Sequence, residues 1–278
     1  MAIDLYRNRD FIPDFDALAA ETAARSRALA QQASVHADVP YGSSPRETMD
    51  IILPPRRLSG APLHLFIHGG YWRTGSKEDH HLVAAPVLAA GAVAAIVTYD
   101  LMPQTRLDAI VGQIRAAARH LIKLAPQFGA DASRLSVSGH SAGAHLATYL
   151  AAYGPEELTE RKLAPPCSML LISGLYDLAD IPHSFLKHEN QMTPAEAGAW
   201  SPLSSHHLPG PRRVIMVAEH DTPPFHIQGE QLAQKLGDAG HKVEFRVEPA
   251  LNHLSIVLEL GDPHSRVGQC LADLVEQA

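Results

Sequence analysis

The sequence is poor in cysteine, and we expect no secretory leader. Its only cysteines, Cys167 and Cys270, lie far apart and match no metal-binding or redox spacing. Such sparse cysteine usage is typical of a reducing compartment, so we expect two buried, inert thiols and a cytoplasmic location. The first ten residues mix charges of both signs and lack the apolar core of a signal peptide.

Long hydrophobic runs are also missing. The longest apolar stretch, Ala84–Val97, is mostly alanine and is interrupted by Pro86 and Gly91. It is shorter than the roughly 20 residues that span a bilayer. We therefore predict a helix followed by a strand here, and no membrane partner.

Charge of one sign is not concentrated anywhere in the chain. The 30 acidic and 23 basic residues give a net charge of −7, and no basic block or stripe is present. This argues against binding to nucleic acid or to an anionic membrane surface. No P-loop and no G-x-G-x-x-G motif occurs, so no nucleotide cofactor is implied and we expect no cofactor at all.

Histidine, by contrast, is abundant, but its spacing is not that of a metal site. The chain has 17 histidines and no H-E-x-x-H motif or Cys/His cluster. The closest pairs are His80-His81, His206-His207 and His183 with His188. We expect these to be solvated or core histidines and predict no metal.

The remaining composition fits one globular domain over residues 1–278. Apolar residues make up 46% and charged residues 19%, and a chain of this length buries a full core without disulfides. Several apolar runs do not alternate with polar residues, which is typical of strands covered by helices on both faces. The predicted strands are Thr48–Leu53, Leu63–Ile67, Val93–Thr98, Leu135–Ser138, Ser168–Ser173, Val214–Ala218 and Val243–Val247. The predicted helices cover 14–33, 78–90, 107–125, 142–153, 226–239 and 264–277.

This alternation of strands and helices predicts an α/β fold with a mostly parallel, doubly wound sheet of about eight strands. Residues 1–35 form an N-terminal arm whose helix, amphipathic and alanine-rich, begins at an aspartate cap, Asp14. Residues 175–212 break the rhythm and are rich in proline and aromatic residues. We interpret them as a small lid-like insertion at the ligand-binding edge of the sheet; the alternative is a surface segment that only covers the core.

The strongest chemical motif is Gly139-His140-Ser141-Ala142-Gly143. It lies between a predicted strand and a predicted helix, as a nucleophilic serine on a strained turn does. Glycine is needed on both sides because the turn leaves no room for a Cβ. The backbone N–H of Ala142, at the helix start, is then placed to bind a developing oxyanion.

A second motif, His68-Gly69-Gly70-Tyr71-Trp72, directly follows a predicted strand. A hydrolase whose nucleophilic serine lies on such a turn takes its second oxyanion donor from the loop after its third strand. If Thr48–Leu53 is counted as the second strand, Leu63–Ile67 is the third. We therefore assign the oxyanion hole to the N–H groups of Gly69, Gly70 and Ala142.

The chain order Ser…Asp/Glu…His limits the partners of the serine. Asp177 and Asp221 each follow a predicted strand, and His253 follows the last one. His226, His241 and His264 lack this context, so His253 is the candidate base.

Five segments together resemble one known family. HGGYW at 68–72, YDLMP at 99–103, GHSAGAHL at 139–146, SGLYDL at 173–178 and NHLS at 252–255 are similar to the arylformamidase (kynurenine formamidase) branch of the α/β-hydrolases, related to the hormone-sensitive-lipase group. The similarity covers nearly the whole chain. It implies the α/β-hydrolase fold and a catalytic acid after the seventh strand. In the same count, Val214–Ala218 is the seventh strand, which favours Asp221 over Asp177.

The resemblance also implies an activity: cleavage of N-formyl-L-kynurenine to L-kynurenine and formate by Ser141, Asp221 and His253, through an acyl-enzyme. The alternatives are a broader carboxylesterase, amidase or carbamate hydrolase on the same residues, and a catalytically silent small-molecule receptor. We expect a small-molecule substrate and allow for a homodimer. The candidate walls for an aromatic substrate are Tyr71, Trp72, Phe185, Trp200 and Phe225.

Overall fold

The computed structural model describes residues 3–56, 59–155, 157 and 164–278. Its centre is an eight-stranded sheet in the order β1-β2-β4-β3-β5-β6-β7-β8. Strands β3 to β8 run parallel, while β2 is antiparallel to both β1 and β4. The strands are β1 (Ser34–Pro40), β2 (Thr48–Leu53), β3 (Ala61–Ile67), β4 (Val93–Val97), β5 (Ala130–His140), β6 (Ser168–Ile172), β7 (Arg212–Ala218) and β8 (Val243–Glu248). The predicted mostly parallel sheet is confirmed.

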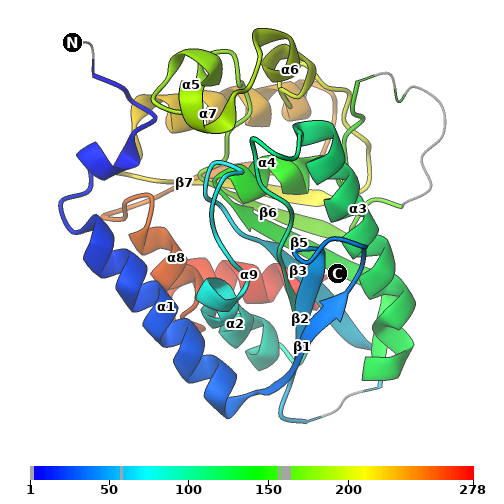
Figure 1. Cartoon of the computed structure of the whole chain (residues 1–278). Coiled ribbons are helices and arrows are strands. Elements are labelled where there is room, and N and C mark those ends of the chain that lie inside the picture. Colours follow the sequence, from blue (N-terminus) through cyan, green and yellow to red (C-terminus); the bar gives the residue numbers. More distant parts are fainter. Residues whose placement is uncertain (1–2, 57–58, 156, 158–163) are drawn as a thin grey trace.

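Helices cover both faces of the sheet, and each face has its own core (Figure 1). One core packs α3, α4 and α7 against the sheet, and the other packs α2, α8 and α9. The α-helices are α1 (Phe15–Gln32), α2 (Ala84–Ala89), α3 (Leu107–Leu124), α4 (Ala142–Thr148), α5 (Lys187–Asn190), α6 (Pro194–Ala199), α7 (Pro223–Asp238), α8 (Ser255–Leu260) and α9 (Arg266–Glu276). Short 3₁₀ segments are η1 (Asn8–Asp10), η2 (Glu78–Val83), η3 (Ala125–Phe128) and η4 (Ile181–His183). Among the helices of the described ranges, none is both long and apolar enough to cross a membrane.

Among the strands and α-helices of the described ranges, β1, α5, α6 and α8 were not predicted. The edge strand β1 has no buried residue, so it carries no hydrophobic pattern, and pairing with β2 alone defines it. Helix α8 has six residues, four of them buried, and is too short for a helical period to show.

Three local expectations are corrected. Asp14 precedes α1, but its side chain makes no capping hydrogen bond, and the buried residues of this helix are the polar Thr22 and Ser26 rather than an apolar stripe. Helix α4 ends at Thr148, because the following residues switch to tighter turns. Cys270 is buried as predicted, whereas Cys167 is exposed.

The segment 175–212 is packed against the domain over much of its length. Leu178, Ile181, Leu186 and Ala197 are fully buried in the core that also contains α3 and α4. The segment therefore covers part of the core, and it also contributes Phe185 and Glu189 to the cavity described below, while its role as a lid stays a prediction. Of the N-terminal arm, residues 1–2 lie outside the described part of the chain.

Several histidines are buried in uncharged form. The Oγ of Ser136 donates to the carbonyl of Leu63, so it accepts from His64 Nδ1–H at 2.8 Å, and His64 Nε2 accepts from Ser138 at 2.7 Å. Burial lowers the pKa of His64 to about 3 and that of His145 and His207 to about 4. These side chains are therefore neutral in the folded protein at neutral pH.

We expect the free energy of unfolding to fall as the pH is lowered below about 6.5, where the unfolded histidines begin to protonate. Since the folded state cannot take up these protons, each such histidine lowers the free energy of unfolding by about 1.4 kcal/mol per pH unit until its folded pKa is reached. Urea unfolding at a series of pH values measures it. His207→Asn should flatten the profile and exposed His264→Asn should not; a flat profile for the unaltered protein would contradict the prediction.

Candidate active site

Ser141 lies on a sharp turn between β5 and α4, at the carboxyl edge of the parallel strands. Its backbone φ is +55°, a conformation that costs a non-glycine residue free energy and is concentrated at functional sites. Its N–H donates to the carbonyl of Ile172 on β6 at 2.8 Å, which helps to hold the turn. A Cβ at Gly139 would lie 2.3 Å from the carbonyl oxygen of Gly143, and one at Gly143 would lie 2.0 Å from that of Ile67. Both flanking glycines are therefore sterically required.

The glycine loop after β3 approaches the same serine. A Cβ at Gly69 would lie 2.9 Å from the carbonyl oxygen of His140 and 3.0 Å from the Cβ of Ser141, so the loop passes too close to the serine for a side chain at this position. Gly70, Tyr71 and Trp72 all have positive φ values, of 108°, 50° and 58°. This strained turn is held by the Nδ2 of Asn190, which donates to the carbonyl of Tyr71 at 3.0 Å, and by the amide of Met102, which donates to that of Trp72 at 2.8 Å. The loop thus lies where the predicted oxyanion donors would have to be.

Asp221 and His253 are joined by a hydrogen bond. Nδ1 of His253 lies 2.6 Å from Oδ1 of Asp221, and both side chains are buried. Oδ2 of Asp221 accepts from the Oγ of Ser173 at 2.6 Å and from the amide of Ala218 at 2.9 Å. Burial alone would raise the pKa of Asp221, but the charge of His253 and these hydrogen bonds hold it below its ordinary value. An ionised Asp221 therefore keeps the proton of His253 on Nδ1 and leaves Nε2 as the basic nitrogen.

The other candidate acid, Asp177, has a local role. Its Oδ1 accepts from the amide of Ala179 at 3.0 Å, and its own amide donates to Gln228 at 3.0 Å. The structure therefore pairs Asp221, and not Asp177, with His253.

His140, next to the serine, was not predicted as a site residue. The centroid of its ring lies 4.7 Å from that of the His253 ring, and both residues line the cavity described below. Burial, reinforced by the nearby His253, lowers the pKa of His140 well below its ordinary value. A neutral His140 does not compete with His253 for the proton.

These residues open into a cavity of about 590 Å³. Ser141, His253, Gly69 and Gly70 all line it. A pocket of this size suits a small organic molecule rather than a polymer.

Only two of the five predicted aromatic walls line this cavity: Tyr71 and Phe185, whose rings meet edge to face at 5.6 Å. The other three are corrected, since they lie in the core. Trp72 donates from Nε1 to His145 at 3.2 Å, and Trp200 packs edge-on against Tyr149. Phe225 packs against the ring of His253, with ring centroids 4.5 Å apart, and this contact helps to fix the position of the imidazole.

A further part of the cavity wall comes from the N-terminal arm, which was predicted only as a helix. It contributes Arg7, Asn8, Arg9, Phe15, Ala19, Thr22 and Ala23. Figure 1 shows this segment running from beside α5 and α7 down into α1. No local pattern could have indicated this, because the contact joins the start of the chain to loops more than 60 residues away. Ser173 was also missed, although it lies within the SGLYDL segment.

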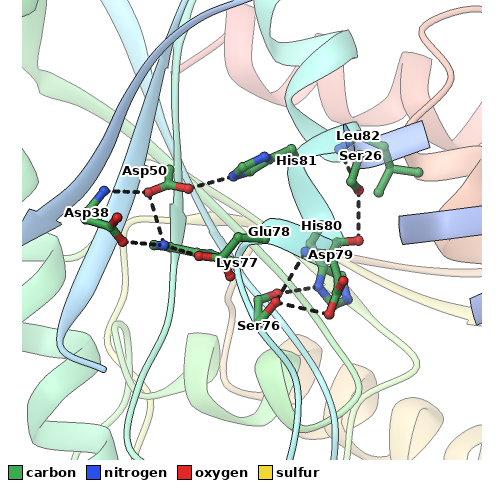
Figure 2. A network of polar contacts seen from close by, with 10 residues as sticks. All are labelled: Ser26, Asp38, Asp50, Ser76, Lys77, Glu78, Asp79, His80, His81 and Leu82. Carbon is green, nitrogen blue, oxygen red and sulfur yellow. Dashed lines mark hydrogen bonds and ion pairs between the residues drawn. The ribbon is translucent and has the colours of Figure 1, made fainter. Parts of the chain in front are cut away.

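A network of polar contacts holds η2 against the edge of the sheet (Figure 2). Nζ of buried Lys77 lies 2.8 Å from a carboxylate oxygen of Asp38 and 3.2 Å from one of Asp50, which also lies 2.7 Å from Nε2 of His81. Ser26 on α1 donates to the carbonyl of Asp79 at 2.8 Å. Since Asp79 and His80 line the cavity, this network positions part of its wall.

The histidine pairs are not gathered into a metal site. Within the described residues, no group of three or more His, Cys, Asp or Glu side chains is placed to hold a metal ion. His80 is hydrogen-bonded through Nδ1 to the carbonyl of Ser76 at 2.9 Å, and His207 through Nε2 to that of Pro202 at 2.9 Å.

Comparison with solved structures agrees with this architecture. A protein from Silicibacter sp. tm1040 is similar with a TM-score of 0.82 and 25% identity, and the match covers 97% of this chain and 98% of that one. The Pyrobaculum calidifontis esterase matches with a TM-score of 0.71 over 94% of this chain and 92% of its own. The protein is a serine hydrolase of the α/β-hydrolase class.

Sequence comparison narrows the class. The BD-FAE family model matches residues 49–207. A kynurenine formamidase from Danio rerio is 32% identical over 244 residues, which are 86% of this chain and 81% of that protein. The chain belongs to the kynurenine formamidase family of α/β-hydrolases. An ethyl acetate hydrolase from Pseudomonas putida is 30% identical over 70% of this chain and 66% of its own. These relatives are enzymes, so the alternative of a silent receptor is set aside.

Proposed function

We propose that the protein hydrolyses N-formyl-L-kynurenine to L-kynurenine and formate, with Ser141 as nucleophile, His253 as base and Asp221 as its partner. The observation that carries this proposal is the 2.6 Å bond between Asp221 and His253 at the cavity that Ser141 and Gly69 also line. The two aromatic walls, Tyr71 and Phe185, fit the aryl group of such a substrate. The kinship with kynurenine formamidases supports the formyl group as the part transferred.

The reaction would proceed in two halves. The Oγ of Ser141 attacks the formyl carbon while its proton passes to Nε2 of His253. The N–H groups of Gly69, Gly70 and Ala142 would bind the resulting oxyanion, each donor contributing about 3–4 kcal/mol. The C–N bond then breaks, and His253 gives its proton to the departing arylamine. Water, deprotonated by His253, releases formate from the serine ester in the same way.

A broader esterase is the second candidate, because the chain is also similar to an ethyl acetate hydrolase. Assays of N-formyl-L-kynurenine and p-nitrophenyl acetate in parallel separate the two. For a formamidase, we expect kcat/KM for the formamide to exceed that for the ester by at least about tenfold. A Ser141→Ala preparation run alongside detects contaminating esterase. Turnover of the ester with no detectable turnover of the formamide would reject the formamidase proposal.

A further inference from the structure

The N-terminal arm is fastened to the loops around the active site. The carbonyl of Leu5 accepts from the Oγ1 of Thr222 at 2.6 Å, and Gln228 on α7 donates to the hydroxyl of Tyr6 at 3.2 Å. The hydroxyl of Tyr71, on the glycine loop, donates to the carbonyl of Tyr6. These bonds hold the backbone of the next residue, Arg7, at the cavity wall.

Three arginines line this cavity, and they differ in how far their donors are occupied. Arg9 is paired with Asp16 at 2.6 Å. Arg73 uses one guanidinium nitrogen to bind Glu189 at 2.7 Å, but its Nε is buried and, among the described residues, has no hydrogen-bond partner. That orphaned donor is costly unless something accepts from it.

Arg7 is the least committed of the three. Among the residues that the structure describes, its one ion pair is with Asp10, at 3.9 Å between two exposed side chains. A pair at that distance, open to solvent, contributes little and does not hold the guanidinium in one place. Its donors remain available to a ligand.

Arg7 and Arg73 meet at one aromatic ring. The Cζ of Arg7 lies 5.7 Å from the centroid of the Phe185 ring, and the Cζ of Arg73 lies 6.0 Å from it. Phe185 in turn contacts Tyr71, which directly follows Gly70. Two cations thus flank an aromatic wall next to the loop that would bind the oxyanion.

The acids that line the cavity are already engaged. Glu189 is paired with Arg73, and Asp79 accepts from the Oγ of Ser76 at 3.0 Å. Although the chain as a whole carries a net charge of −7, the two guanidinium groups give this part of the cavity a local positive charge that would attract a carboxylate.

We propose that Arg7 and Arg73 form a carboxylate-binding subsite that selects substrates whose aromatic leaving group carries a carboxylate on its side chain. The inference deepens the proposed function and rests on it for the acyl chemistry at Ser141. Guanidinium groups bind carboxylates through paired, charge-assisted hydrogen bonds, and the buried Nε of Arg73 would gain the acceptor it lacks. The arm is then a specificity element, contributed by the part of the chain farthest in sequence from the base.

The test compares each acid with its own methyl ester. One pair is N-formyl-L-kynurenine and its methyl ester; the other is 3-(4-acetoxyphenyl)propanoate and its methyl ester. The measurement is the ratio of kcat/KM for acid over ester in the unaltered protein, in Arg7→Gln, in Arg73→Gln and in Arg73→Lys. Arg27→Gln, on the exposed face of α1, is the matched control.

We expect the unaltered protein to prefer the acid and each glutamine variant to lower the ratio about 10- to 100-fold, mainly by raising KM for the acid. Arg73→Lys should lie between, because it keeps the charge and loses the planar fork. Arg27→Gln should keep the ratio. Equal losses on acid and ester, or no preference for the acid in the unaltered protein, would overturn the subsite.

The ester pair separates this inference from the formamidase proposal. Discrimination within the acetate esters but no turnover of either formamide would retain the subsite and reject the formamidase activity. Turnover of N-formyl-L-kynurenine with an acid-to-ester ratio that neither Arg7→Gln nor Arg73→Gln changes would retain the formamidase activity and reject the subsite. Because Arg7 is exposed, Arg7→Gln should fold normally, and its thermal unfolding checks this directly.

Discussion

Replacing Ser141 by alanine should lower kcat by at least about 10⁴-fold, while the melting temperature stays within a few degrees of the original value. The reason is that the proposed covalent intermediate forms on this hydroxyl, whereas its removal creates no large cavity. Alanine also keeps the Cβ of Ser141 and adds no atom toward Gly69. Steady-state kinetics on purified protein, with thermal unfolding of the same samples, measures both quantities.

The exposed Ser204 provides the matched control, and Ser204→Ala should retain full activity. A serine-directed phosphonate should also inactivate the unaltered protein and add its mass to the peptide containing Ser141. Activity of Ser141→Ala above about one hundredth of the original, at unchanged melting temperature, would remove Ser141 as the nucleophile.

Asp221→Asn should lower kcat by about 10⁴-fold, because an amide in this position favours the wrong tautomer of His253. Asp221 accepts from three groups, His253, Ser173 and the amide of Ala218, and its lowered pKa keeps it ionised at neutral pH. An asparagine cannot accept from all of them, because one of its two terminal atoms is a donor. The expected loss is therefore in kcat, with a smaller change in KM.

Asp177→Asn is the matched control, since it alters the same side chain on the neighbouring loop. Its hydrogen bond to Ala179 uses one oxygen, which asparagine retains, so kcat should change by less than about threefold. Ranking the two variants by kcat at one pH is sufficient. If Asp177→Asn were the more damaging substitution, the acid would belong to the loop after β6 and the present assignment would be wrong.

Most of the sheet could be predicted because its strands carry their own signal. Leu63–Ile67 and Val214–Ala218 are continuous apolar runs, and both lie inside strands buried on both faces. The exposed β1 has no such signal and is defined only by its partner. The cytoplasmic location and the homodimer stay predictions.

The strand–turn–helix around Ser141 and the glycine loop could be predicted from the sequence, because their requirements are local: a serine between two glycines, and two glycines after a strand. Chain order limited the acid to two aspartates, and the family resemblance favoured Asp221. The hydrogen bond between Asp221 and His253 is visible only in the folded chain, since 32 residues and a whole helix separate them along the sequence. The tertiary structure likewise placed Trp72, Trp200 and Phe225 in the core and brought Arg7 to the cavity. An aromatic or a cation has the same local pattern in a wall as in a core or on a surface, so only the folded chain decides which surface it lines.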